Sequence, residues 1–136
     1  MMLPSFYETL ARIQHALGRK EEAMLSIDSA IECTHQFGEK WLLAEVYRYK
    51  GDLLGDSVSS EAGARETYFE KALATARDHS LRALELRAAT SLARLWAETG
   101  ERHKAHDLLA PLYGWFSEGF DTVDLKRTKA LLDEIA

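Results

Sequence analysis

Apolar residues recur along the chain at intervals of three and four positions, the spacing that places side chains on one face of an α-helix. In the first stretch these residues are Phe6, Leu10, Ile13 and Leu17, and Gly18 gives an end signal. Six further stretches follow the same pattern, and no run of alternating apolar and polar residues competes with it. The pattern predicts an all-α fold with helices at about 4–17, 21–37, 41–54, 64–79, 81–99, 102–117 and 122–135.

Small and apolar residues also repeat from one pair of predicted helices to another. Two copies share the same offsets, carried by Gly18, Ala23, Ile27 and Ala30 and by Gly100, Ala105, Leu109 and Leu112. Between them, Gly51, Leu54, Phe69 and Ala72 supply a middle copy whose turn is about two residues longer. The pattern resembles the tetratricopeptide repeat, with a period of about 41 residues instead of roughly 34. The resemblance implies a single domain, 1–136, built as an α-α superhelix: three helix pairs, at about 4–37, 39–79 and 81–117, and a capping helix at about 122–135.

The stretch PLYGWFSEGFDT at 111–122 departs from plain amphipathic helix. Pro111 falls inside the second helix of the last pair, where proline removes a backbone hydrogen bond and predicts a bend. Gly119 suits a left-handed helix exit, and Asp121 suits the N-cap of the last helix. We expect the aromatic residues of this joint to fill a wedge between the bent helix and the cap, because buried aromatics are more often core than ligand site. They are Tyr113, Trp115, Phe116 and Phe120.

The tail AHDLLAPLYGWFSEGFDTVDLKRTKALLDEI resembles the C-terminal segment of long bacterial signalling proteins. Those proteins join a class III adenylate or guanylate cyclase domain, or a regulatory ATPase module, to a tetratricopeptide-like region. The resemblance implies a regulatory or docking segment and carries over no catalytic residues. No phosphate loop GxxxxGK[ST] occurs in the chain, and we expect no enzymatic activity, cofactor or metal. On the capping helix, Lys126, Arg127 and Lys129 are expected on the outer, polar side.

Composition and charge exclude several classes of function. The 136 residues carry a net charge of −5, which disfavours nucleic acid as a partner because phosphate binding depends on clustered lysine and arginine. Cys33 stands alone, so the sequence has no disulfide framework or cysteine metal motif. No window reaches the roughly 18 apolar residues of a membrane span, and the first residues lack a signal-peptide pattern. We expect a cytoplasmic protein with no membrane partner.

Arginines recur on the predicted first helix of each pair. In tetratricopeptide arrays this helix lines the concave face, and the repeat register places Arg12, Arg48, Asp52, Arg87 and Arg94 there. A cationic groove of this kind suits a protein or an acidic peptide as partner, because guanidinium binds carboxylate through paired hydrogen bonds. The alternative is ordinary surface charge, since Glu8 with Arg12 and Arg48 with Asp52 are four residues apart on one helix.

The resulting hypothesis is a non-catalytic interaction or scaffold module in bacterial signalling. One alternative is a sensor domain that binds a small effector and controls an attached cyclase or ATPase, and another is an oligomerisation adaptor. Self-association is expected at the N-terminal repeat edge if the chain is cut from a longer array, because Tyr7 and Ala11 would then lack a neighbour.

Overall fold

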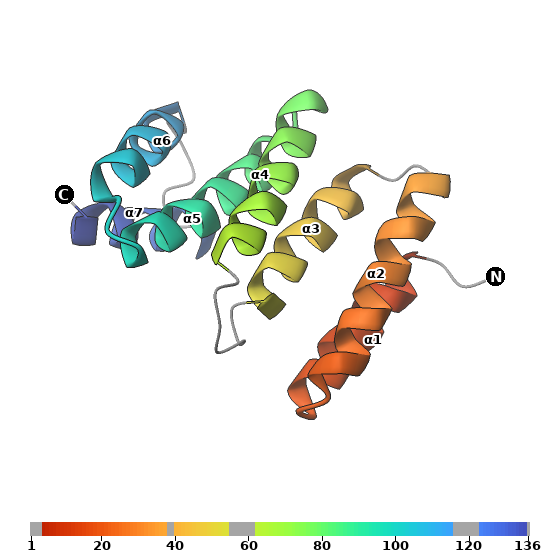
Figure 1. Ribbon diagram of the computed structural model, residues 1–136. Helices are drawn as coiled ribbons and strands as arrows, with labels where there is room; N and C mark the ends of the chain where they lie inside the picture. The colour runs from red at the N-terminus through yellow and green to blue at the C-terminus, as the bar shows by residue number, and fades with distance from the viewer. Residues whose placement is uncertain (1–3, 38–39, 55–61, 116–122, 136) are drawn as a thin grey trace.

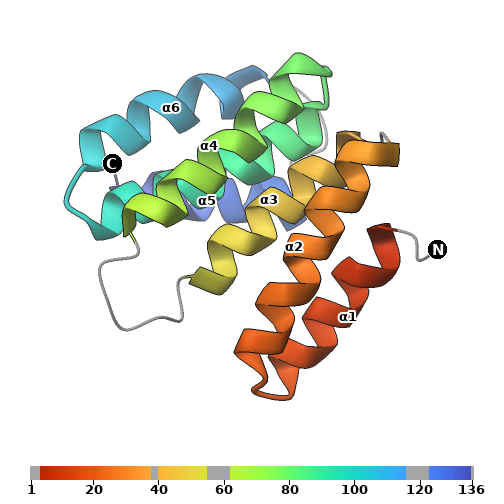
Figure 2. The same ribbon diagram turned by 45° about the vertical axis from the view of Figure 1, so that its right-hand side comes forward.

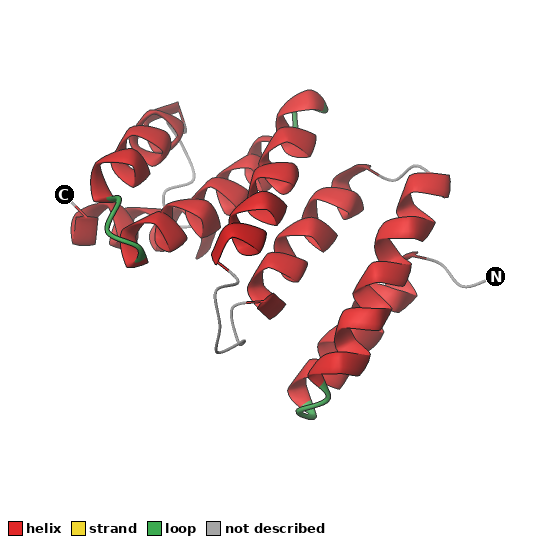
Figure 3. Ribbon diagram, in the orientation of Figure 1, coloured by secondary structure: helices red, strands yellow, loops and turns green. Residues whose placement is uncertain are grey.

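The computed structural model describes residues 4–37, 40–54, 62–115 and 123–135, and the regular structure in these ranges is α-helix throughout (Figure 3). The prediction of an all-α fold is confirmed, and each observed helix lies within a few residues of a predicted one. The helices are α1 (Pro4–Ala16), α2 (Lys20–Phe37), α3 (Lys40–Leu54), α4 (Ala62–Asp78), α5 (Arg82–Glu98), α6 (Arg102–Trp115) and α7 (Val123–Ile135).

The helices are arranged in two layers. In one layer α1, α3, α5 and α7 follow one another in contact, and in the other α2, α4 and α6 each pack against the helices before and after them. Along the molecule the helices follow their order in the sequence, from α1 and α2 at one end to α6 and α7 at the other (Figures 1 and 2). Because one layer contains every second helix, residues far apart in the sequence share one face of the molecule.

Three helices end in the same left-handed turn. Gly18 after α1 has φ +78° and Gly100 after α5 has φ +90°, values that favour glycine. At Gly100 the following amide, of Glu101, donates to the carbonyl of Trp96 at 2.7 Å, which satisfies an end carbonyl of α5. Ser80 closes α4 in the same way with φ 55°, although serine is not glycine. The glycines therefore identify two of these helix ends in the sequence, but not the third.

The core consists of two clusters that meet between α2 and α3. The smaller joins α1, α2 and α3 around Ile27, Val46 and Leu53, and the larger extends from α3 to α7 around Phe69 and Leu92. Fully buried alanines in both clusters let neighbouring helices approach closely, and they include Ala23, Ala30, Ala72, Ala89 and Ala93.

The orientation of α1 corrects the sequence expectation. Its apolar stripe faces solvent, with Phe6 47%, Ile13 52% and Leu17 66% exposed, whereas Ala11 is fully buried against the smaller cluster and Tyr7 packs on it. The prediction that Tyr7 and Ala11 form an exposed edge is therefore wrong. Small Ala11 allows close approach of neighbouring helices, so α1 packs through the face that carries Ala11 and Tyr7 and leaves the opposite, apolar stripe to solvent.

The joint near the C-terminus is described in part. Pro111 lies inside α6, which continues to Trp115, and Tyr113 packs half-buried against the larger cluster. Trp115 does not fill a wedge: it is 58% exposed, and the Arg82 guanidinium lies 4.6 Å from its ring centroid. The reason is helical spacing, since Leu109 and Tyr113 lie on the buried stripe and position 115 falls outside it. Phe116, Gly119, Phe120 and Asp121 lie outside the described residues.

Candidate functional site

A cavity of about 560 Å³ lies along the layer formed by α1, α3, α5 and α7. Each of these helices contributes to it, and we call it the arginine groove. Its lining consists of Arg12, Glu45, Arg48, Arg87, Thr90, Ser91, Arg94, Asp124 and Arg127. Five guanidinium groups face two carboxylates, so the lining carries a net charge of +3 in a chain whose net charge is −5.

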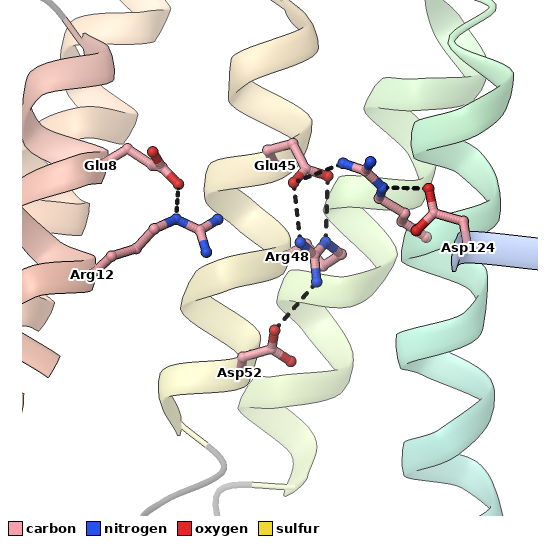
Figure 4. Close-up of polar contacts among 7 residues, drawn as sticks. Glu8, Arg12, Glu45, Arg48, Asp52 and Asp124 are labelled. Atoms are coloured by element: carbon pink, nitrogen blue, oxygen red, sulfur yellow. Dashed lines mark hydrogen bonds and ion pairs between the residues drawn. The ribbon is translucent and has the colours of Figure 1, made fainter. Parts of the chain in front are cut away.

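Helical spacing explains how the groove is assembled. On α5 the lining residues occur at 87, 90, 91 and 94, which are intervals of three and four and therefore one helix face. On α3 and α7 the pairs Glu45 with Arg48 and Asp124 with Arg127 are each three residues apart. Figure 4 shows carboxylates and guanidiniums from separate helices pointing toward one another across this face.

Arg48 lies near the centre of the groove and is held by two acidic residues of its own helix. Its Nη2 lies 3.0 Å from Glu45 and its Nη1 lies 3.3 Å from Asp52 (Figure 4). Burial by itself lowers the pKa of Arg48, but the hydrogen bond to Glu45 and the charges of Glu45, Asp52 and Asp124 raise it above the ordinary value. Arg48 is therefore a permanent cation whose hydrogen bonds are largely used within the chain.

Asp52 is the weaker of the two acidic partners of Arg48. Burial raises the pKa of the Asp52 carboxyl above its ordinary value, although nearby arginines, Arg48 first among them, act to lower it. Its side chain is 45% exposed. An anionic ligand in the groove would compete with this carboxylate for Arg48.

The other two arginines with acidic partners are held differently. Arg87 of α5 donates to Asp124 of α7 at 2.8 Å and also lies 3.5 Å from Glu45 of α3, so it links three helices. Arg12 of α1 pairs with Glu8 and stacks on Tyr49, with its guanidinium carbon 4.3 Å from the ring centroid. These contacts restrain both side chains. They also join helices, because Arg87 reaches α3 and α7 and Arg12 stacks on Tyr49 of α3.

Arg94 and Arg127 have more freedom to bind a ligand. Both side chains are exposed, and neither makes an ion pair or hydrogen bond with another residue in the described part of the chain. They come from adjacent helices, α5 and α7, and Ser91 lines the groove with them. Since guanidinium presents five donors in a planar fork, this pair can bind carboxylate or phosphate oxygens without first breaking an internal ion pair.

The structure brings together most of the residues that the sequence selected. Arg12, Arg48, Arg87 and Arg94 line one cavity, and Asp52 adjoins it through its ion pair with Arg48. The contribution of α7 was missed: Arg127, expected on the outer side of the cap, lines the groove, and Asp124 closes it against Arg87. The available signal was the alternation of helices, which places the seventh helix in the same layer as the first, third and fifth.

A second cavity, of about 440 Å³, is lined by residues of α2, α3 and α4. Tyr47 and Tyr68 form its aromatic wall, and Lys71 lies 5.1 Å from the centroid of the Tyr68 ring. Lys50 is paired with Asp28, and the Tyr47 hydroxyl is 3.0 Å from His35 Nε2. Its lysines are balanced by Asp28 and Glu32, so this cavity lacks the charge excess of the arginine groove.

The described residues contain no candidate membrane span and no candidate metal cluster. None of their helices has the length and apolar character needed to cross a membrane, and no group of three or more metal-ligating side chains occurs among them. Compared with models of known protein families and with curated proteins, the chain matches none of them. The arginine groove is therefore the feature of the described chain whose geometry and charge point to a function.

Proposed function

We propose that this chain is a non-catalytic interaction module that docks an acidic peptide segment of another protein in the arginine groove. The observation that carries the proposal is the lining: five arginines from four helices outnumber the two carboxylates of the lining, and also the four carboxylates present when the ion-paired Glu8 and Asp52 are counted, in a chain of net charge −5. A ligand with carboxylate side chains would gain paired hydrogen bonds from guanidinium groups, and opposite charge would also speed its association.

The arginines of the groove form two groups, those that pair with carboxylates of the chain and those that do not, and the two groups suit different roles in binding. Arg12, Arg48 and Arg87 are already paired with carboxylates of the chain, whereas Arg94 and Arg127 keep their donors available. We infer that an acidic segment first engages Arg94 and Arg127 and then extends toward Arg48. Ordinary surface charge is the alternative, and under it the affinity for an acidic peptide depends on the net charge of the protein and not on which of these residues is changed.

The experiment is a fluorescence anisotropy titration of the protein with a labelled peptide of alternating glutamate and serine. Arg94→Glu and Arg127→Glu should each weaken binding by about 5- to 10-fold, because each removes a cation and introduces a repulsive charge. Lys126→Glu is the matched control: it makes the same charge change on α7, at an exposed residue outside the groove lining. Equal losses in all three variants would mean that only net charge matters, and the docking proposal would be rejected.

We also propose a tetratricopeptide-like superhelix as the architecture, supported by the two-layer packing and by the repeated spacing of small residues. Under this proposal the module acts in the cytoplasm as a docking or regulatory segment in bacterial signalling, alongside a cyclase or ATPase domain. Comparing the activity of such a full-length protein with and without this segment tests that role.

A second candidate is a sensor for a small anionic effector. The volume of the arginine groove, about 560 Å³, lies within the usual range for small-molecule sites, and this supports the sensor as a second candidate. A ligand of this kind raises the melting temperature by mass action, by an amount that grows with the logarithm of its concentration relative to its Kd. Thermal scans with inorganic phosphate and with dicarboxylates therefore separate the two candidates: stabilisation by a small anion at millimolar concentration supports the sensor, and its absence leaves the peptide module.

A further inference from the structure

We propose that α1 is the contact surface for a second copy of this chain, which packs against it as an antiparallel helix. The surface is the α1 seam, defined as Phe6, Leu10, Ile13 and Leu17. Three of its four side chains are about half exposed or more, and Leu10 is half-buried. Of the six large apolar side chains exposed among the described residues, three belong to this seam, whereas Leu25, Trp41 and Trp115 come from three other helices, and such a grouping indicates a contact surface.

The seam has the spacing of a helix–helix interface. Its residues are separated by four, three and four positions, so Phe6, Leu10 and Ile13 lie within a narrow stripe on one side of α1. Leu17, the first residue after α1, continues the stripe because its amide still donates to the carbonyl of Ile13, at 3.0 Å. Thr9 and Ala16 lie next to the stripe, and both are exposed and uncharged. This is the pattern of two consecutive heptads, which is the shortest length over which a partner helix can form successive layers of contacts.

The intervals between the seam residues are four, three and four positions, and they are the same from either end of the seam. This symmetry favours a second copy over an unrelated helix. In an antiparallel pair centred between Leu10 and Ile13, Leu10 meets Ile13 of the second copy and Phe6 meets Leu17 of the second copy. Each contact occurs twice, as a two-fold axis requires. The large and medium side chains therefore fall opposite one another in a single register.

Charge supports the same partner. The charged residues of α1, Glu8 and Arg12, pair with each other, and Arg12 lines the arginine groove, so they lie away from the seam. Near the turn after α1, Arg19 is 3.7 Å from Glu22, which leaves no net charge from that pair. Two copies can therefore meet through the seam without like charges in contact, and the groove of each stays accessible.

The first test is the oligomeric state. Because two heptads bury a small area, we expect a dimer that is populated at about 100 µM protein and dissociates on dilution. Ile13→Glu should keep the protein monomeric over the same range in sedimentation equilibrium. Leu25→Glu is the matched control, since Leu25 is 70% exposed on α2 and lies outside the seam. Unchanged peptide binding by Ile13→Glu, together with its circular dichroism, shows that the variant is folded.

The second test is the direction of the two helices. In a Cys33→Ser background, Phe6→Cys protein mixed with Leu17→Cys protein should form a mixed disulfide under mild oxidation. Phe6→Cys protein alone should not cross-link, because eleven residues at 1.5 Å per residue separate the two positions by roughly 16 Å in an antiparallel pair. A monomer at every concentration, assemblies larger than a dimer, or efficient cross-linking of Phe6→Cys alone would overturn the proposal.

Discussion

Arg87 Nε donates a 2.8 Å hydrogen bond to the Asp124 carboxylate, which joins α5 to α7 across 37 positions of sequence. Beside this ion pair the hydroxyl groups of Thr90 and Thr128 lie 2.9 Å apart in a buried contact between the same two helices. One contact is charged and partly exposed, and the other is neutral and buried. Together they hold α7 where it can supply Arg127 to the groove.

The Arg87–Asp124 pair should make a small, measurable contribution to stability. Because the Arg87 side chain is 41% exposed, we expect Arg87→Gln and Asp124→Asn each to lower the unfolding free energy by about 0.5–1 kcal/mol. A double-mutant cycle measured by urea denaturation should give a favourable coupling energy. Strictly additive losses would mean that the two side chains do not stabilise each other.

Gly51 should resist a substitution that normally favours a helix. It is buried in α3, and a Cβ atom placed there would lie 2.5 Å from the ring of Phe69, which is itself buried. We expect Gly51→Ala to destabilise the protein by about 1–3 kcal/mol through this overlap. Gly114 in α6 has no atom within 4 Å of such a Cβ. Gly114→Ala should therefore stabilise by roughly 0.5–1 kcal/mol, and thermal unfolding of the two variants should move in opposite directions.

Ser80 occupies a turn position that suits glycine. Its φ of 55° is left-handed, as at Gly18 and Gly100, which close α1 and α5. Ser80→Gly should raise the unfolding free energy by about 0.5–1 kcal/mol, because glycine adopts this conformation without a Cβ penalty. Gly100→Ser is the reverse change and should lower it. A less stable Ser80→Gly variant, measured by urea denaturation, would show that the turn carries no such penalty.

The second cavity should make stability fall at alkaline pH. Burial raises the pKa of Tyr47 above its ordinary 10.0. Burial alone lowers the pKa of Lys50, but hydrogen bonds to Asp28 and Tyr68 outweigh it and raise the pKa above 10.5. Both groups therefore keep their protons to higher pH in the folded chain than in the unfolded one. Since the folded state binds more protons in this window, stability decreases as pH rises above about 10.

The variant Lys50→Met removes one of these two groups. The unfolding free energy of this variant, followed by urea denaturation from pH 9 to about 11, should fall less steeply than that of the wild type. Lys126→Met, at an exposed residue of α7, controls for the loss of any lysine. Parallel pH profiles for the wild type and Lys50→Met would contradict the role assigned to Lys50.

The helices could be predicted from the sequence because their boundaries depend on local signals. Periodic apolar residues mark all seven, and Gly18 and Gly100 mark two helix ends by their own backbone preference. The arginines of α1, α3 and α5 could also be grouped, because alternate helices of a repeated pair share a face. These predictions need only local structure and the order of elements.

Other features depend on what covers a surface, which periodicity does not encode. The stripe at Phe6, Ile13 and Leu17 was predicted as one helix face, but its exposure follows from the side of α1 that α2 and α3 cover. The place of Arg127 in the groove likewise follows from the packing of α7 on α5. Tertiary contacts decide the exposure of the stripe and the place of Arg127. The sequence therefore indicated these residues but not what surrounds them.

The central claim is that the arginine groove binds an acidic segment, and Asp52 offers the most direct test. Asp52 competes for Arg48 from inside the chain, at 3.3 Å, so Asp52→Asn should free this guanidinium and tighten binding of the glutamate–serine peptide. We predict an affinity about two- to five-fold higher than that of the wild type in the same anisotropy titration. An unchanged or weaker affinity would contradict the claim, because removal of a carboxylate beside the groove should favour an anionic ligand whichever of the arginines it contacts.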